Sequence, residues 1–113
     1  MKQIKAIIQP HALDRVLLAL EHLEGLPGIS VSDVSGWGRG GSDDEEGSAK
    51  AGRYHFVKKT KLEIVVNDED VDRTIQAIAD AAHSGRAGDG KIFISDVEDT
   101  LRIRTGERGR DAV

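Results

Sequence analysis

The chain opens with alternating apolar and polar residues. Ile4, Ala6 and Ile8 fall on one side of an extended segment formed by residues 2–8, as the inward face of a β-strand requires. Residues 59–66 alternate in the same way, with leucine, isoleucine and valine on one face. Both segments are therefore predicted to be strands with one buried face.

Two further segments have the composition of strands but a less regular pattern. Residues 29–37 are rich in β-branched side chains, yet Val31 and Val34 break strict alternation, which predicts a strand with a bulge. Residues 91–94 form a short, mainly apolar run that predicts a fourth strand. Residues 97–104 are partly apolar, and we expect them to pack as an added strand or a turn.

Two segments repeat apolar residues at the spacing of a helix. In residues 12–24 leucine and valine recur every three or four positions, with Pro10 before this segment and Gly25 after it. The second helix is predicted to follow Asn67 as its N-cap. Its apolar stripe consists of Val71, Ile75, Ile78 and Ala82.

The order β-α-β-loop-β-α-β predicts an α+β fold, a ferredoxin-like βαββαβ sandwich in one domain spanning residues 1–113. Two helices would cover one face of a four-stranded sheet. The other face would carry Ile7, Val65 and one residue of the Ile92–Phe93 pair. Because this face is apolar, we expect it to be buried by self-association.

Composition excludes several classes of protein. The chain has no cysteine, which excludes disulfides, thiolate metal sites and a cysteine nucleophile, and its four histidines show no i, i+4 pairing, so we expect no metal site. No apolar run approaches the roughly 20 residues of a membrane span, and no signal peptide is evident, which predicts a cytoplasmic protein. The net charge of −4 argues against nucleic acid as a partner.

The strongest candidate for chemistry is a glycine-rich turn, in which residues 85–91 match the pattern GxxxxGK of a phosphate-binding loop. The glycines would free backbone N–H groups, and Lys91 would add a positive charge. Ile92, however, stands where serine or threonine would hold Mg²⁺, and the loop leads from a helix into a strand, so a P-loop NTPase is not expected. A plain αβ turn is the alternative interpretation.

Two other cationic segments could contribute to such a site. Arg102 and Arg104 would lie on one face of an extended segment and could clamp a polyphosphate, unless they are simply solvated. Residues 36–41 combine glycines with Trp37 and Arg39, although glycines at a strand end are more often turn residues. Residues 38–56 that follow carry no periodicity, and loops of this length are commonly functional or disordered.

Five blocks of the chain together resemble the PII signal-transduction family. They are MKQIKAIIQPHALDRVLLAL, SGWGRG, KLEIVVNDEDVD, SGRAGDGKIFISDV and LRIRTGERG, and they cover almost the whole chain. The resemblance implies a homotrimer that binds ATP or ADP in the clefts between subunits. It also implies a regulator that is not an enzyme. Such a regulator relays adenylate charge, and often 2-oxoglutarate, to a transporter or enzyme of nitrogen metabolism through a T-loop, here about residues 38–57.

The resemblance also assigns residues. A phosphate loop at about 84–91, a strand end, and an arginine clamp from the neighbouring subunit in segment 97–113 would hold the nucleotide, and Lys59 matches a lysine near the 2-oxoglutarate pocket. The expected nucleotide contacts are Gly36, Gly38, Arg39, Gly88, Asp89, Gly90, Lys91, Arg102 and Arg104.

Three positions depart from the family pattern. Gly40 replaces a glutamine that helps to hold Mg²⁺ and 2-oxoglutarate, which argues against both ligands. Gly52 falls on the tyrosine that some members uridylylate, and Ser48 falls near the arginine that enters an ammonium channel. The residues around Ser48 are acidic at 43–46, so a different transporter is implied as the partner.

Three alternative functions stay open. The protein could sense AMP, ADP or bicarbonate for a transporter of another substrate. It could be a weak ATP-hydrolysing enzyme, although no residue pattern supplies a base for water. It could also be a trimeric metal-related module, which the absence of cysteine and the single methionine disfavour.

Overall fold

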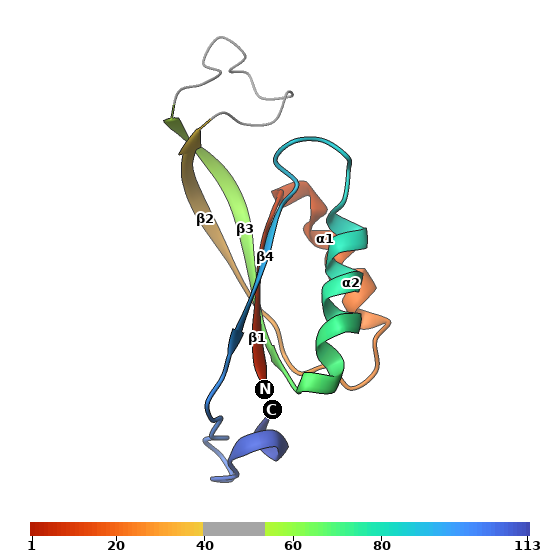
Figure 1. Ribbon diagram of the computed structural model, residues 1–113, viewed down its shortest axis with the longest axis vertical. Coiled ribbons are helices and arrows are strands. Elements are labelled where there is room, and N and C mark those ends of the chain that lie inside the picture. The colour runs from red at the N-terminus through yellow and green to blue at the C-terminus, as the bar shows by residue number, and fades with distance from the viewer. Residues whose placement is uncertain (40–53) are drawn as a thin grey trace.

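The computed structural model describes residues 1–39 and 54–113. These residues form four strands and two α-helices, with a short 3₁₀ turn before each helix and another near the C-terminus (Figure 1). In chain order the elements are β1 (Lys2–Ile8), α1 (Leu13–Glu21), β2 (Ser30–Arg39), β3 (Tyr54–Val66), α2 (Val71–Ala82) and β4 (Gly90–Asp96).

The sheet has the strand order β2-β3-β1-β4, and each pair of neighbours is antiparallel. Both helices lie on one side of the sheet and leave the other side uncovered (Figure 1). This arrangement confirms the α+β, ferredoxin-like βαββαβ fold expected from the order of the elements.

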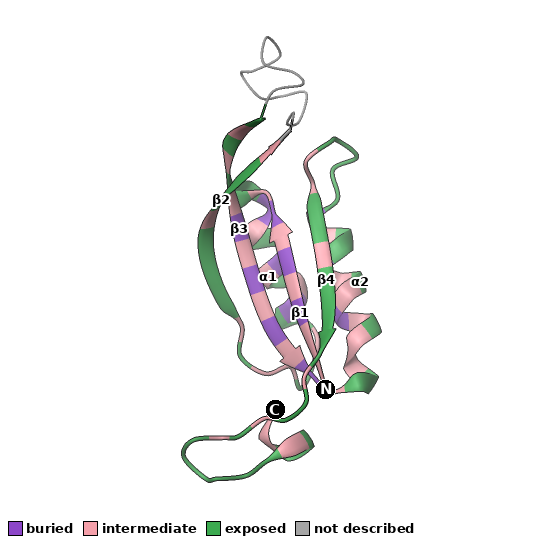
Figure 2. Ribbon diagram, turned by 60° about the vertical axis from the view of Figure 1, so that its left-hand side comes forward, coloured by how far each residue is buried: buried purple, intermediate pink, exposed green. Residues whose placement is uncertain are grey.

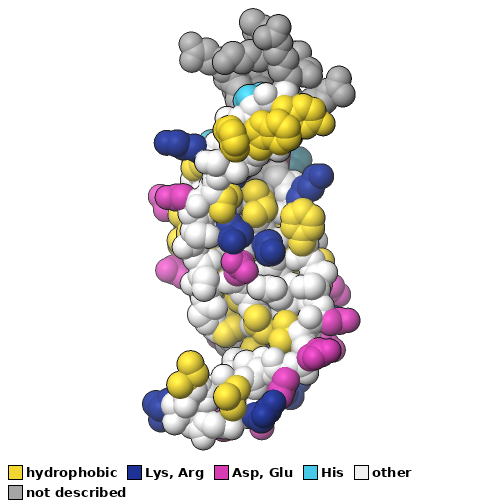
Figure 3. Space-filling view, turned by 90° about the vertical axis from the view of Figure 1, so that its left-hand side faces the viewer, with side chains coloured by type: hydrophobic (Ala, Val, Ile, Leu, Met, Phe, Trp, Pro, Cys, Tyr) yellow, Lys and Arg dark blue, Asp and Glu magenta, His cyan; other side chains and the backbone are white. Residues whose placement is uncertain are grey.

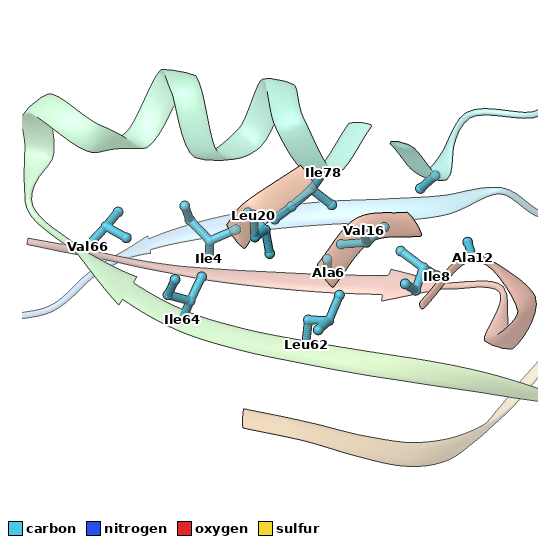
Figure 4. Packing of buried hydrophobic residues seen from close by; sticks show 11 residues of the cluster. Ile4, Ala6, Ile8, Ala12, Val16, Leu20, Leu62, Ile64, Val66 and Ile78 are labelled. Atoms are coloured by element: carbon cyan, nitrogen blue, oxygen red, sulfur yellow. The ribbon is translucent and has the colours of Figure 1, made fainter. Parts of the chain in front are cut away.

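The core lies between the helices and the inward face of the sheet (Figure 4). Alternate residues of β1 and β3 point into it because the side-chain period of a strand is two. α1 contributes Val16 and Leu20, and α2 contributes Ile78. The remaining buried apolar side chains are Ile4, Ala6, Ile8, Ala12, Leu62, Ile64, Val66 and Ala82.

The helix-free face of the sheet carries both apolar and charged side chains (Figure 3). In β4, Phe93 pairs with Lys5 on this face, whereas Ile92 pairs with Ala6 on the helix side. Phe93 is therefore the apolar residue of its pair that faces away from the helices, and it is 53% exposed. In Figure 2 buried and intermediate residues alternate along β1 and β3, whereas β4 is mainly exposed.

β2 and β3 form a twisted two-stranded ribbon that extends beyond the helices (Figures 1 and 2). Its register is continuous from Ser30 to Arg39, so the predicted bulge in β2 is wrong. Val31 and Val34 break the alternation because they lie on opposite faces of a regular strand. β3 begins at Tyr54, five residues earlier than expected, and the two ends of the supposed loop are paired strands.

The ends of both helices differ from the prediction. α1 begins after a 3₁₀ turn at Pro10–Ala12 and ends at Glu21, three residues early. A second 3₁₀ turn at Asp68–Asp70 precedes α2, and Asn67 caps this turn without a side-chain hydrogen bond. Neither helix among the described residues has the length and apolar character needed to cross a membrane.

The segment after β4 folds as a separate turn below the sheet and adds no strand to it (Figure 1). A single bridge joins Leu101 to Arg108, and a 3₁₀ turn at Gly109–Ala112 ends the chain. An ion pair between Arg110 and Glu69 ties this segment to the turn before α2. The segment thus depends on polar contacts and not on the core.

Candidate functional site

A cleft of about 400 Å³ opens where β1 ends, β4 begins and the β2–β3 ribbon leaves the body of the molecule. Its walls come from the ribbon on one side and from the α2–β4 loop on the other. The lining residues are Ile7, Gly36, Trp37, Gly38, Val57, Lys59, Ala87, Gly88, Gly90 and Lys91. Most of the residues expected at the strand end and in the glycine-rich loop therefore meet in one place.

Gly90 allows the loop to pass directly against β1. Its φ is +116°, and a β-carbon at this position would lie 1.8 Å from the carbonyl oxygen of Ile7. No other residue type fits there without moving the end of the strand. Gly88 also has a positive φ, of +90°, so the loop reaches Lys91 through two backbone conformations that favour glycine.

The carbonyl oxygen of Gly88 accepts two hydrogen bonds from outside its loop. Lys59 Nζ donates from β3 at 2.9 Å, and Gln9 Nε2 donates from the end of β1 at the same distance. The two donors link the ribbon, the first strand and the glycine-rich loop. Lys59 thus lies in the cleft, next to the loop, and Gln9 is a residue that the motifs did not single out.

The carboxylate of Asp89 points into its own loop and is absent from the lining of the cleft. It accepts hydrogen bonds from the hydroxyl and N–H of Ser84, the latter at 2.7 Å, and from the N–H of Gly85 at 3.1 Å. The Ser84 hydrogen bonds, the Gly85 N–H and nearby His83 hold the pKa of Asp89 below its usual value. Asp89 therefore acts in this structure as a brace for the turn.

Arg102 and Arg104 lie at the opposite end of the sheet, beyond the last residue of β4 (Figure 1). Residues 103–105 form a turn, so the expectation that both guanidinium groups share one face of an extended segment is wrong. Arg102 donates to Glu107 Oε1 at 2.9 Å and to the carbonyl oxygen of Asp111 at 3.1 Å. Within one chain these arginines do not join the cleft.

Of the three residues expected at the strand end, Gly36 and Gly38 lie in the described part of the chain, and Arg39 is described through its backbone alone. Gly36 pairs with Val57, and Gly38 pairs with His55, in the section of the ribbon that lines the cleft. Arg39 pairs with Tyr54 through the backbone, and its side chain lies outside the described part of the chain. The expectations for Gly40, Ser48, Gly52 and the acidic run at 43–46 also fall on residues outside the described ranges.

The cleft can bind an anion, because its cations are Lys59 and Lys91 and its wall includes a glycine-rich backbone. Its apolar lining, which includes Ile7, Val57 and Trp37, would suit the non-polar part of the same ligand. Within residues 1–39 and 54–113, no group of three or more histidine, aspartate or glutamate side chains could hold a metal ion.

Comparison with known proteins identifies the family and agrees with this fold. The family model described as nitrogen regulatory protein P-II matches residues 1–107. A nitrogen regulatory protein P-II from Azospirillum brasilense is 48% identical over 113 residues, which are the whole of both chains. Nitrogen regulatory protein P-II 2 from Methanothermobacter thermautotrophicus is 49% identical, over all of this chain and 97% of the relative.

A crystal structure of Arabidopsis thaliana PII bound to citrate superposes with a TM-score of 0.79. The two sequences are 39% identical, and the match covers 99% of this chain and 91% of the Arabidopsis chain. The chain belongs to the P-II family of nitrogen regulatory proteins, which are signal-transduction proteins.

Proposed function

We propose that this protein binds ATP or ADP in the cleft and reports the bound nucleotide to a partner protein. Lys91 and the backbone of the glycine-rich loop hold the phosphates, and the walls of the cleft hold the base. The β2–β3 ribbon carries the change to residues 38–57, which dock on a membrane transporter or a metabolic enzyme. The protein has no catalytic activity of its own.

One observation carries the proposal. Gly90 passes so close to Ile7 that only glycine fits, and this contact brings Lys91 and the loop to the mouth of the cleft. The contact holds the glycine-rich backbone and Lys91 in the same cleft as Lys59. Backbone N–H groups with cations nearby are what a phosphate ligand binds.

The nucleotide site is completed by a second copy of the chain. Arg102 and Arg104 lie too far along the sheet to reach the cleft of their own chain, and the helix-free face leaves Phe93 half exposed. Burying this face in a homotrimer brings the arginines of one subunit to the cleft of the next. P-II proteins regulate partners as trimers, which supports this assembly.

A small carboxylate is the second ligand that the cleft would accept. Among the described residues, Lys59 is held by one hydrogen bond, to a neutral carbonyl, and a carboxylate would be a stronger acceptor for it. The Arabidopsis relative was crystallised with citrate. Gly40 offers no side chain to a metal ion, so we propose that 2-oxoglutarate, if it binds, does so without the Mg²⁺ bridge, and that bicarbonate competes with it.

Calorimetric titration tests the proposal with ATP, ADP and AMP, each with and without Mg²⁺, 2-oxoglutarate and bicarbonate. We expect Lys91→Met to weaken ADP binding at least tenfold, about 1.4 kcal/mol. Lys58→Met is the matched control, because Lys58 is exposed and pairs with Ser35 on the other face of the ribbon. Equal ADP affinity in the two variants would overturn the assignment of the phosphate site.

Assembly needs its own measurement. We expect a trimer by light scattering, and we expect Phe93→Glu to shift it toward the monomer while the circular dichroism stays unchanged. A monomeric native protein that still binds ADP with full affinity would contradict the shared site.

A further inference from the structure

The two arginines of the proposed clamp are in different states. The guanidinium of Arg102 is engaged by Glu107 Oε1 at 2.9 Å and by the Asp111 carbonyl at 3.1 Å. Arg104 is exposed in the following turn, and among the described residues it has no hydrogen-bond or ion-pair partner. Two cations that would serve one ligand thus differ in whether they are already occupied.

The backbone places Glu107 opposite Arg102. The N–H of Arg102 donates to the carbonyl of Glu107 at 2.9 Å, and the N–H of Gly106 donates to the carbonyl of Arg102 at 2.8 Å. Gly106 has a φ of +76°, which closes the turn between them. The hydrogen bonds of the main chain therefore hold the backbone of Glu107 beside Arg102, and this placement does not depend on the charge of the carboxylate.

The carboxylate of Glu107 binds its arginine as a phosphate oxygen would. Guanidinium groups bind carboxylate and phosphate through the same paired N–H donors. A phosphate ligand must then displace Glu107 before it can use Nη1 of Arg102. When only a fraction of the protein has the arginine free, the apparent dissociation constant rises by the inverse of this fraction.

We propose that Glu107 is a built-in competitor for Arg102 that sets the affinity of the clamp for phosphate and favours ligands of high charge. This inference rests on the proposed nucleotide site. A terminal phosphate carries close to two negative charges at neutral pH, against one on the carboxylate. ATP and ADP can therefore displace Glu107, whereas a singly charged carboxylate ligand gains nothing by the exchange.

The pair is also weak enough to exchange. The side chains of Arg102 and Glu107 are 39% and 46% exposed, and ion pairs of such exposure are screened by water and salt. Arg108, by contrast, reaches the same carboxylate oxygen of Asp99 through two nitrogens, and the other oxygen of Asp99 accepts the N–H of Thr100 and of Gly109. The several hydrogen bonds to Asp99 hold the segment in place. The carboxylate of Glu107, by contrast, makes one hydrogen bond with Arg102.

Calorimetric titration of the full-length protein with ADP tests the proposal. Glu107→Gln keeps the shape and the backbone hydrogen bonds but removes the charge, and we expect it to bind ADP roughly two- to fivefold more tightly. Glu98→Gln is the control, because Glu98 is exposed in the same segment and removes the same charge away from Arg102. An equal gain in ADP affinity in Glu107→Gln and Glu98→Gln would mean that the effect comes from net charge alone, and it would overturn the proposal.

A double variant isolates the arginine. In an Arg102→Met background the substitution of Glu107 should change ADP affinity by less than a tenth of its effect in the native chain, because the competitor has lost its target. A full effect in that background would also overturn the proposal. Failure of the native protein to bind either ADP or ATP would instead overturn the nucleotide site itself, so the two failures are distinguishable.

Discussion

The two ends of this molecule hold their cationic residues in contrasting ways. At the cleft, Lys91 follows a glycine whose missing side chain lets the loop touch β1. Beyond the other end of the sheet, Arg102 belongs to a small turn that exposed ion pairs hold together. The first arrangement is sterically determined, and the second is electrostatic.

The two ends of the molecule therefore differ in how far their side chains and backbone can move. The close contact at Gly90 cannot shift without displacing the end of β1, so we expect the end of the α2–β4 loop that meets β4 to be rigid. The single exposed contact between Arg102 and Glu107 exchanges partners at little cost, so this part of the C-terminal segment can adapt to a ligand or to a second subunit.

The largest effect is expected at Gly90. Gly90→Ala places a β-carbon 1.8 Å from the Ile7 carbonyl oxygen, which must displace the end of β1 or of β4. We expect the free energy of unfolding to fall by about 2–4 kcal/mol in urea titrations. Gly28→Ala is the control, because a β-carbon there meets nothing within 4 Å, and its change should stay within about 0.5 kcal/mol. Similar urea midpoints for Gly90→Ala and Gly28→Ala would show that the contact between Gly90 and Ile7 does not hold the loop in place.

The donors to Gly88 should give a smaller and cooperative effect. Gln9→Met and Lys59→Met each leave one hydrogen bond on the Gly88 carbonyl, whereas the double variant leaves none from these side chains. We expect amide exchange in residues 84–90 to rise roughly two- to threefold in each single variant and more than tenfold in the double. Lys58→Met serves as the control. Strictly multiplicative single effects would mean that the two donors act independently.

In the C-terminal segment we expect the loss of Arg102 to change the stability of the fold only slightly. Arg102→Met removes an exposed ion pair, and the free energy of unfolding should change by less than about 1 kcal/mol in the same urea assay. A loss as large as that of Gly90→Ala would place the C-terminal segment in the cooperative core. The contrast between the two ends would then be wrong.

The smallest effect concerns the pKa of a single carboxyl group. The hydrogen bond from Arg110 lowers the pKa of Glu69 to about 2. A lowered pKa in the folded state favours folding above the ordinary pKa of glutamate, and this contribution is lost as the pH falls through about 2. In carbon-detected titrations we expect Arg110→Gln to raise the pKa of Glu69, and Arg104→Gln, in the same segment, to leave it near 2. An unchanged pKa in Arg110→Gln would exclude the tether.

Periodicity was sufficient for the architecture but not for the ends of the elements. The inward faces of β1 and β3 alternate, so both strands and their layer were predictable. The first residues of β3, Tyr54–Val57, were missed because this part of the ribbon lies beyond the helices and has no buried face to impose a pattern. Burial produces the alternation, and an exposed ribbon does not need it.

The site was predictable where backbone chemistry dictates residue type. Gly88 and Gly90 stand out because few residues tolerate their positive φ angles, and Lys91 stands out as the cation that follows them. Gln9 was missed because it acts over 79 positions of sequence, through a contact that exists only once the sheet is closed. The state of Arg102 also escaped prediction, since the turn at Gly106 determines its partner.

The aromatic side chains near the far end of the described ribbon have an optical consequence. Trp37 is the one tryptophan in the sequence, it lines the cleft, and its ring stacks on Tyr54 with 4.7 Å between centroids. Phe56 is a third ring nearby, with its centroid 6.5 Å from that of Trp37. Ultraviolet emission from the unmodified protein therefore comes from one indole that contacts both the cleft and the ribbon. A change in the intensity or wavelength of this emission would report that a ligand occupies the cleft. Because the indole stacks on Tyr54, the emission would also report a change in the ribbon, without any attached dye.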